Sequence, residues 1–203
     1  METPKRDLRK VLEEDGSHAE WPCGSDLRVS LVPPPGWRWV PDDEWRQELE
    51  DWDVDLEART GISKEAFGAP AIRVVNTPPG YVPESPSVQV TVVPDTDDEW
   101  AGTEMSVLLH LAFVRLAFDD VEVPWGPEPV VFRGHPGHKA VVRLAQPRRD
   151  KPTLHFEMHL VHVRVGGYLV QIALGAPAHG APEGLWEELR SIYESIRIEV
   201  AVP

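Results

Sequence analysis

The sequence predicts an α+β fold, in which helices cover an antiparallel β-sheet. Short runs rich in β-branched residues outnumber the segments with helical spacing, and prolines or glycines bound most of these runs. Gly166-Gly167 stands between two apolar runs and indicates a tight hairpin, the connection that antiparallel neighbours use. The chain has 203 residues, the length of one domain, so we expect these elements to share one fold.

We assign residues 1–26 to an N-terminal tail and residues 27–200 to a single domain. The tail mixes charged residues with glycines. A short helix could form over residues 7–14, and Trp21 could dock the tail on the domain. Cys23, the only cysteine, excludes an internal disulfide and a cysteine-only metal cluster.

Strands are assigned to runs that alternate apolar and polar residues or are rich in valine and isoleucine. The turns between them contain prolines, which fix φ and remove a backbone donor, as in PPPG at residues 33–36. The proline-rich loop over residues 77–87, TPPGYVPESPS, has no helical character. In chain order, the predicted strands cover residues 27–32, 37–40, 71–76, 88–93, 129–133, 138–145, 153–165, 168–174 and 196–200.

The first predicted helix covers residues 42–57, DDEWRQELEDWDVDLE. Nine of these residues are acidic and one is basic, so the segment contributes −8 to the net charge. Trp45, Leu49 and Trp52 recur at helical spacing and form one apolar stripe, with the acids on the other faces. Asp42 is placed to cap the first turn.

The second predicted helix covers residues 97–118 and is the main buried helix. Val107, Leu111 and Val114 recur in it at spacings of four and three residues. The third covers residues 182–195. It begins with a proline, which suits a first helical turn, and it has one apolar stripe.

The net charge of −14, from 34 acidic and 20 basic residues, argues against a nucleic-acid or anionic-membrane binder, because such surfaces need lysine and arginine. The sequence shows no export signal and no apolar stretch long enough to span a membrane, so we expect a cytoplasmic protein without membrane insertion. No nucleotide-binding, phosphate-binding or nucleophile motif is present. We therefore expect no cofactor and no enzymatic activity.

The C-terminal half contains a Gly-Gly hairpin, the strand YLVQIALGAP and a helix with Trp186 and the run YESI, while an N-terminal strand runs into PPPGWRW. In this order of elements, residues 27–200 resemble the Mog/PsbP-like superfamily. That group includes PsbP subunits of photosystem II, a Ran-binding nuclear import factor, LpqN-type lipoproteins and effector-associated chaperones of type VI secretion. The resemblance implies an α/β/α sandwich, with helices on both faces of an antiparallel sheet, and a protein that docks on other proteins.

The acidic helix and the tryptophans around it are the strongest functional feature. Tryptophan is enriched at binding hot spots, and localised charge steers association. We predict a non-catalytic adaptor, assembly factor or chaperone-like accessory subunit that binds another protein through a basic or apolar segment; the oligomeric state stays open. The alternative is a solubilising face over a buried stripe. The predicted partner-binding residues are Asp43, Glu44, Trp45, Glu48, Asp51, Trp52, Asp55, Trp37, Trp39 and Tyr81.

A second hypothesis is a divalent-metal site or a metal-dependent enzyme. Strand periodicity places His155, Glu157 and His159 on one face of the strand over residues 153–165. Imidazole and carboxylate groups are zinc ligands. The alternative is an ordinary polar strand face, since no compact metal-binding motif accompanies these residues.

Overall fold

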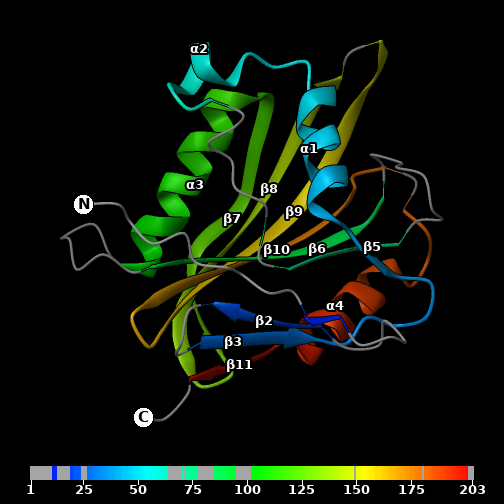
Figure 1. Cartoon of the computed structure of the whole chain (residues 1–203). Helices are drawn as coiled ribbons and strands as arrows, with labels where there is room; N and C mark the ends of the chain where they lie inside the picture. The colour runs from blue at the N-terminus through cyan, green and yellow to red at the C-terminus, as the bar shows by residue number, and fades with distance from the viewer. Residues whose placement is uncertain are drawn as a thin grey trace, which may run out of the picture.

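The computed structural model describes residues 11–12, 19–23, 27–63, 70, 72–76, 85–94, 102–148, 150–179 and 181–200. These residues form two antiparallel sheets and four helices (Figure 1). The predicted α+β class with an antiparallel sheet is therefore confirmed.

The larger sheet consists of β4 (Arg38–Trp39), β5 (Ile72–Val75), β6 (Ser87–Pro94), β7 (Asp119–Phe132), β8 (His135–Arg148), β9 (Lys151–Val165) and β10 (Tyr168–Pro177). Their order across the sheet is β4-β5-β6-β10-β9-β8-β7. The predicted Gly166-Gly167 hairpin joins β9 to β10, and both glycines have positive φ, a conformation that glycine adopts without steric cost.

The smaller sheet consists of β1 (Val11–Leu12), β2 (Ala19–Cys23), β3 (Leu27–Leu31) and β11 (Arg197–Val200), in the order β1-β2-β3-β11. Part of the segment that we assigned to a tail therefore pairs with the domain, because β2 pairs with β3. Residues 11–12 form a strand, which corrects the short helix expected over residues 7–14 at these two positions. The other residues of that expected helix lie outside the described part of the chain.

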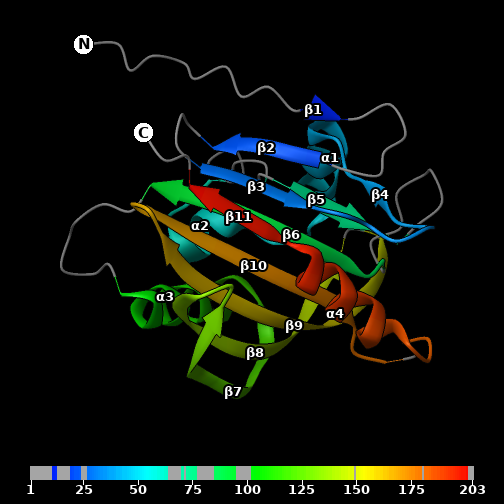
Figure 2. The same cartoon turned by 90° about the horizontal axis from the view of Figure 1, so that it is seen from below.

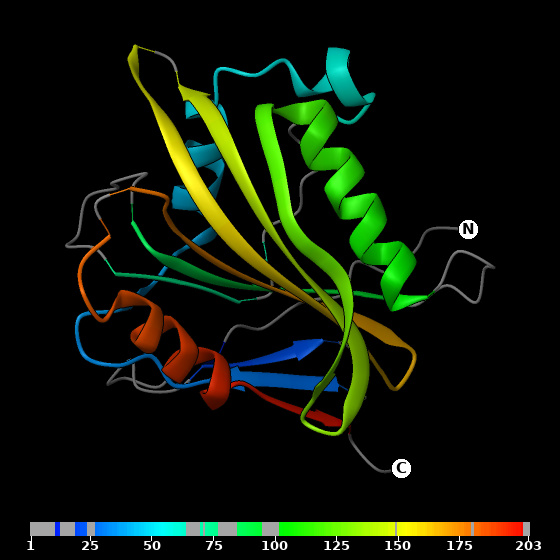
Figure 3. The same ribbon diagram turned by 180° about the vertical axis from the view of Figure 1, so that it is seen from behind.

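The helices are α1 (Asp42–Asp51), α2 (Leu56–Thr60), α3 (Thr103–Ala117) and α4 (Leu185–Ser195). α1, α2 and α3 lie on one side of the larger sheet, and the smaller sheet with α4 lies on the other (Figures 1 and 2). Figure 3 shows the long strands β7, β8 and β9 running between α3 and α4. Helices thus flank both faces, as the resemblance implies.

Two apolar clusters hold these layers together. On one face of the larger sheet, Val107 and Leu111 of α3 pack with Val142 of β8 and Leu160 of β9. On the other face, the apolar residues of α4 join β3, β5, β6 and β10 in a second cluster. Burial of these side chains is the main force that holds the helices on the sheet.

The acidic segment forms two helices instead of the one predicted. α1 ends at Asp51, Trp52 then makes a β-bridge with Arg148 of β8, and the Asp55 carboxylate caps α2 by accepting a hydrogen bond from the Ala58 amide at 3.0 Å. Asp42 is not a cap but the first residue of α1, and Pro41 occupies the cap position without a side-chain bond.

β7 is much longer than the strand predicted over residues 129–133, since it begins at Asp119 immediately after α3. It forms one edge of the larger sheet. Its pairing with β8 shifts register between Asp119 and Glu128, and three of its residues are prolines. The predicted strand begins only at Pro129, after the other two prolines, whereas at a sheet edge proline is compatible with a strand.

Candidate functional site

The histidine-bearing strand β9 divides its side chains between two faces, as the alternation predicts. Phe156 and Leu160 pack in the cluster beneath α3. His159 instead stacks on Trp186 of α4, with ring centroids 4.4 Å apart and an interplanar angle of 27°. Strand geometry places Glu157 on the same side as His159. The predicted polar face therefore exists and is turned toward α4.

On this face, Glu157 connects Arg143 of β8 to His159. Arg143 Nε donates to Glu157 Oε2 at 2.7 Å, and His159 Nε2 lies 3.0 Å from Glu157 Oε1. Partial burial alone would raise the pKa of Glu157, but the hydrogen bonds with His159 and Arg143 and their charges lower it below its ordinary value. Glu157 thus stays ionised and holds both neighbours in place.

The strand register extends this face to the edge of the sheet. Val141 of β8 pairs with His159, and Trp125 of β7 pairs with Val141. Directly paired residues of antiparallel strands project to the same side, so the Trp125 ring belongs to the face of His159. Trp125 is 61% exposed. We call Trp125, Arg143, Glu157, His159 and Trp186 the Trp125 face.

The three predicted metal ligands lie on one strand face but do not converge. His155 lies beside His179, with ring centroids 6.0 Å apart, and both carboxylate oxygens of Glu157 are already hydrogen-bonded. Within the described ranges, no group of three or more His, Cys, Asp or Glu residues is arranged to hold a metal ion. What the structure builds here is an ion-pair network with aromatic neighbours.

The apolar stripe of the acidic helix is core, which corrects the predicted docking surface. Trp45 is buried with Leu49, and the buried Glu48 carboxylate forms an ion pair with Arg73 of β5. Trp37 is also buried, and its Nε1 donates to Glu188 Oε2 of α4 at 3.1 Å. Trp37, Trp45 and Glu48 are therefore not accessible to a partner in this structure.

Other predicted docking residues are half-buried. Arg38 forms two hydrogen bonds with the Glu44 carboxylate, at 3.1 and 2.7 Å. Trp52 makes edge contacts with Trp45 and Phe118, at centroid distances of 6.4 and 5.4 Å. Trp39 packs against the cluster beneath α4. The tryptophans near the acidic helix thus serve mainly in packing, the alternative noted from the sequence.

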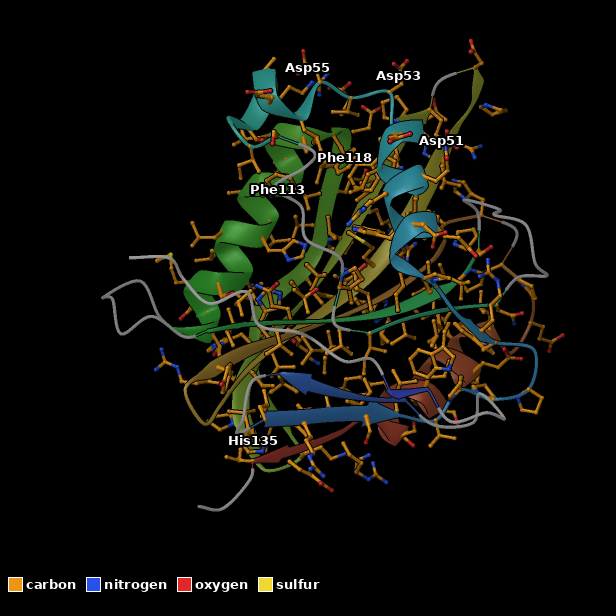
Figure 4. The ribbon with its side chains drawn as sticks, in the orientation of Figure 1. Asp51, Asp53, Asp55, Phe113, Phe118 and His135 are labelled. Atoms are coloured by element: carbon orange, nitrogen blue, oxygen red, sulfur yellow. The ribbon has the colours of Figure 1, made fainter. Side chains whose placement is uncertain are left out.

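The exposed acids of this region form a separate surface. Asp51, Asp53 and Asp55 lie at the same end of the molecule, where α1 gives way to α2 (Figure 4). Asp51 is half-buried, and Tyr81 lies outside the described residues. We name the fully exposed acids the acidic edge: Asp43, Glu50, Asp53, Asp55 and Glu57.

A partly buried polar row beneath α3 was not found from the sequence. His138 of β8 and Gln171 of β10 both pair with His162 of β9, so their side chains share the face that α3 covers. His138 Nδ1 lies 2.9 Å from Thr103 Oγ1, and His162 Nδ1 lies 2.8 Å from Ser106 Oγ. These bonds fix the first turn of α3 on the sheet. The row is visible only once the strand register is known.

Two histidines of this region are kept neutral. The ring centroids of His110 and His162 lie 5.3 Å apart. Burial lowers the pKa of His110 to about 4, and burial together with the neighbouring His110 lowers the pKa of His162 to about 3. Ser106 and His162 have the separation of a nucleophile and its base, but His162 is fully buried and its Nε2 has no partner in the described part of the chain. The pair therefore lacks the third group that orients a catalytic histidine.

Neither the family models nor the curated proteins contain a match to this chain. Among solved structures, it is similar to LpqN, involved in cell envelope biogenesis of Mycobacterium tuberculosis, at 14% identity, 94% coverage of this chain, 90% of that chain and a TM-score of 0.48. It is also similar to PsbP of Synechocystis, at 12% identity, 94% coverage of this chain, 92% of that chain and a TM-score of 0.45. A third similar structure is the Ran-binding protein Mog1p of Saccharomyces cerevisiae, at 11% identity, 94% coverage of this chain, 95% of that chain and a TM-score of 0.44. At these identities the likeness is one of fold alone. No helix of the described residues is long and apolar enough to cross a membrane.

Proposed function

We propose that this chain is a non-catalytic protein-binding module, an adaptor, assembly factor or chaperone-like accessory subunit, and that it docks its partner on the Trp125 face. The observation that supports this most directly is the exposure of Trp125 on the sheet edge, in line with Val141 and the stacked pair His159–Trp186. Tryptophan and arginine are both enriched at hot spots, and the Trp125 face has an exposed tryptophan and an arginine held by Glu157.

The Trp125 face is pre-organised for binding. The Glu157 carboxylate holds Arg143 and His159 by hydrogen bonds, and the His159 ring is held against Trp186. Side chains that are already fixed lose little conformational entropy when a partner covers them. Arg143 engages Glu157 through Nε, and a guanidinium has four further N–H donors that an acceptor on the partner can engage.

The acidic edge has a complementary role in this proposal. Its exposed carboxylates form a localised negative field that favours approach of a basic segment, and such charges change association rates more than final affinity. Of the docking residues predicted from the sequence, Asp43 and Asp55 therefore remain part of the proposal. The predicted tryptophans are assigned a packing role instead.

The test is affinity capture with site-specific photo-crosslinking in extract from the source cells. A benzophenone side chain at position 125 should crosslink a partner, whereas the same group at the exposed position Val131 of β7 should not. The double variant Trp125→Ala with Arg143→Glu should lose that partner. Recovery of the same partners by the double variant and by the unmodified chain would contradict the proposal for this face.

A further inference from the structure

The helix α3 is apolar on two sides. One side packs on the larger sheet, where Val107, Leu111 and Val114 are buried. The opposite side is turned away from the sheet, yet Leu109 and Leu116 on it are 53% and 57% exposed. A helix that is apolar all round is normally covered all round. In this protein, the described residues cover only one side of α3.

The exposed residues of α3 follow the pattern of a helix–helix seam. Met105, Leu109, Ala112 and Leu116 occur at spacings of four, three and four residues, and none of them is buried. This is the spacing of the apolar positions that pack two helices side by side. Ala112 at the centre leaves room for close approach. We call these four residues the outer stripe.

Two charges flank the outer stripe near its opposite ends. Glu104 lies in the first turn of α3 and Arg115 in the last, and both are exposed. At 100° per residue they fall on the same flank of the stripe, separated along the axis by about 16 Å. Neither has an ion-pair partner within the described ranges. The flank thus has one unpaired negative charge and one unpaired positive charge, placed almost symmetrically about Leu109 and His110.

We propose that the outer stripe packs antiparallel against the outer stripe of a second copy of this chain, giving a two-fold symmetric dimer. Antiparallel packing centred near Leu109 places Glu104 opposite the partner's Arg115 and Arg115 opposite the partner's Glu104. In parallel two-fold packing the two charged flanks lie on opposite sides of the seam, so neither charge faces an opposite one. The charge pattern therefore selects the antiparallel arrangement. A two-fold interface uses the same patch on both subunits, which one self-complementary stripe satisfies.

The dimer is expected to be concentration-dependent. α3 has 15 residues and a length of about 22 Å. One face of a helix this short buries less than the area of about 800 Å² per partner in a standard interface. Sedimentation velocity over about 1 μM to 1 mM should therefore show a reversible monomer–dimer equilibrium. The variant Leu109→Asp with Leu116→Asp should stay monomeric, whereas Trp125→Ala, on the other face of the sheet, should dimerise as the unmodified chain does. A chain that is monomeric over the whole range would overturn the proposal.

Charge exchange tests the antiparallel arrangement. Glu104→Arg and Arg115→Glu should each weaken the dimer by about tenfold, because each places like charges at both ends of the seam. An equimolar mixture of the two single variants should form a heterodimer with the affinity of the unmodified chain, since every pair is then of opposite sign. A mixture that dimerises no better than the separate variants would exclude this packing. The result is independent of the partner proposed for the Trp125 face, because α3 lies on the opposite side of the sheet.

Discussion

Arg73 of β5 and Glu48 of α1 form a buried, two-point ion pair, and the Trp45 ring lies 4.7 Å from the guanidinium carbon of Arg73. Both charges are almost fully removed from water. The pair therefore fixes α1 to the edge of the larger sheet, and it turns the remaining acids of that helix outward. The acidic helix is in this way part of the fold as well as a charged surface.

Removing one partner of this ion pair should strongly destabilise the protein. We expect Glu48→Gln to lower the free energy of unfolding by about 3–5 kcal/mol, because Arg73 would be left buried without its counter-charge. Urea unfolding monitored by tryptophan fluorescence measures the change. The exposed Glu50 of the same helix supplies the control, and Glu50→Gln should change stability by less than about 0.5 kcal/mol. Equal effects of the two substitutions on the free energy of unfolding would contradict a stabilising role for the buried ion pair between Glu48 and Arg73.

His110 and His162 should make stability pH-dependent in the acid range. The pKa of His110 is lowered from 6.5 to about 4 in the folded protein, so between these values the unfolded chain binds more protons than the folded one. The free energy of unfolding should therefore fall as the pH falls from about 6.5 to about 4. Denaturant titrations at a series of pH values measure the slope of the free energy of unfolding against pH.

Substitution of both histidines should remove part of that dependence. In His110→Gln with His162→Gln, neither side chain takes up a proton, so the slope between about pH 6.5 and 4 should be flatter than in the unmodified chain. The control substitution is His135→Gln, which replaces a histidine at the opposite end of the molecule from Asp51, Asp53 and Asp55 (Figure 4). An unchanged slope in the double variant would show that other groups cause the acid sensitivity.

Gly137 of β8 should not tolerate a side chain. A Cβ atom there would lie 2.2 Å from the backbone oxygen of His162 and 2.6 Å from Val163 Cγ1, so the strands would have to separate. We expect Gly137→Ala to cost about 1–3 kcal/mol in thermal or urea unfolding. Gly102, with no atom within 4 Å of a Cβ and an ordinary φ, is the matched site, and Gly102→Ala should cost less than about 1 kcal/mol. A smaller effect at Gly137 than at Gly102 would refute the close contact.

The strand face with His155 should not bind zinc stoichiometrically. Both carboxylate oxygens of Glu157 are engaged by Arg143 and His159, and a zinc site with fewer than three protein ligands is weak. Isothermal titration with zinc chloride, compared between the unmodified chain and His155→Ala with His159→Ala, measures this. Tight binding of one zinc ion that the double variant loses would restore the metal hypothesis.

Much of the fold follows from local patterns in the sequence. The alternation in β9 correctly separates Leu160 from His159, because the strand period is two residues and each face has its own environment. The stripe of Trp45 and Leu49 correctly marks the inward face of α1. The break at Trp52 was missed, since the bridge to Arg148 that ends α1 joins residues far apart in the chain.

The functional surfaces are less predictable for a related reason. Tryptophan suits both a core and a binding site, so composition alone assigned the buried Trp37 and Trp45 to the surface and passed over the exposed Trp125. The pairing of Gln171 and His138 with His162 depends on strand register, which no local pattern specifies. Which residues meet across strands is information that only the assembled sheet contains.

The prolines of β7 have a consequence for how this protein can associate. Pro124, Pro127 and Pro129 lack the amide hydrogen that an added strand would need, and they stand along the outer strand of the larger sheet. Copies of the chain are thereby hindered from joining edge to edge into an open-ended fibre. Contacts along this edge are left to side chains, whose shape and charge select the neighbour.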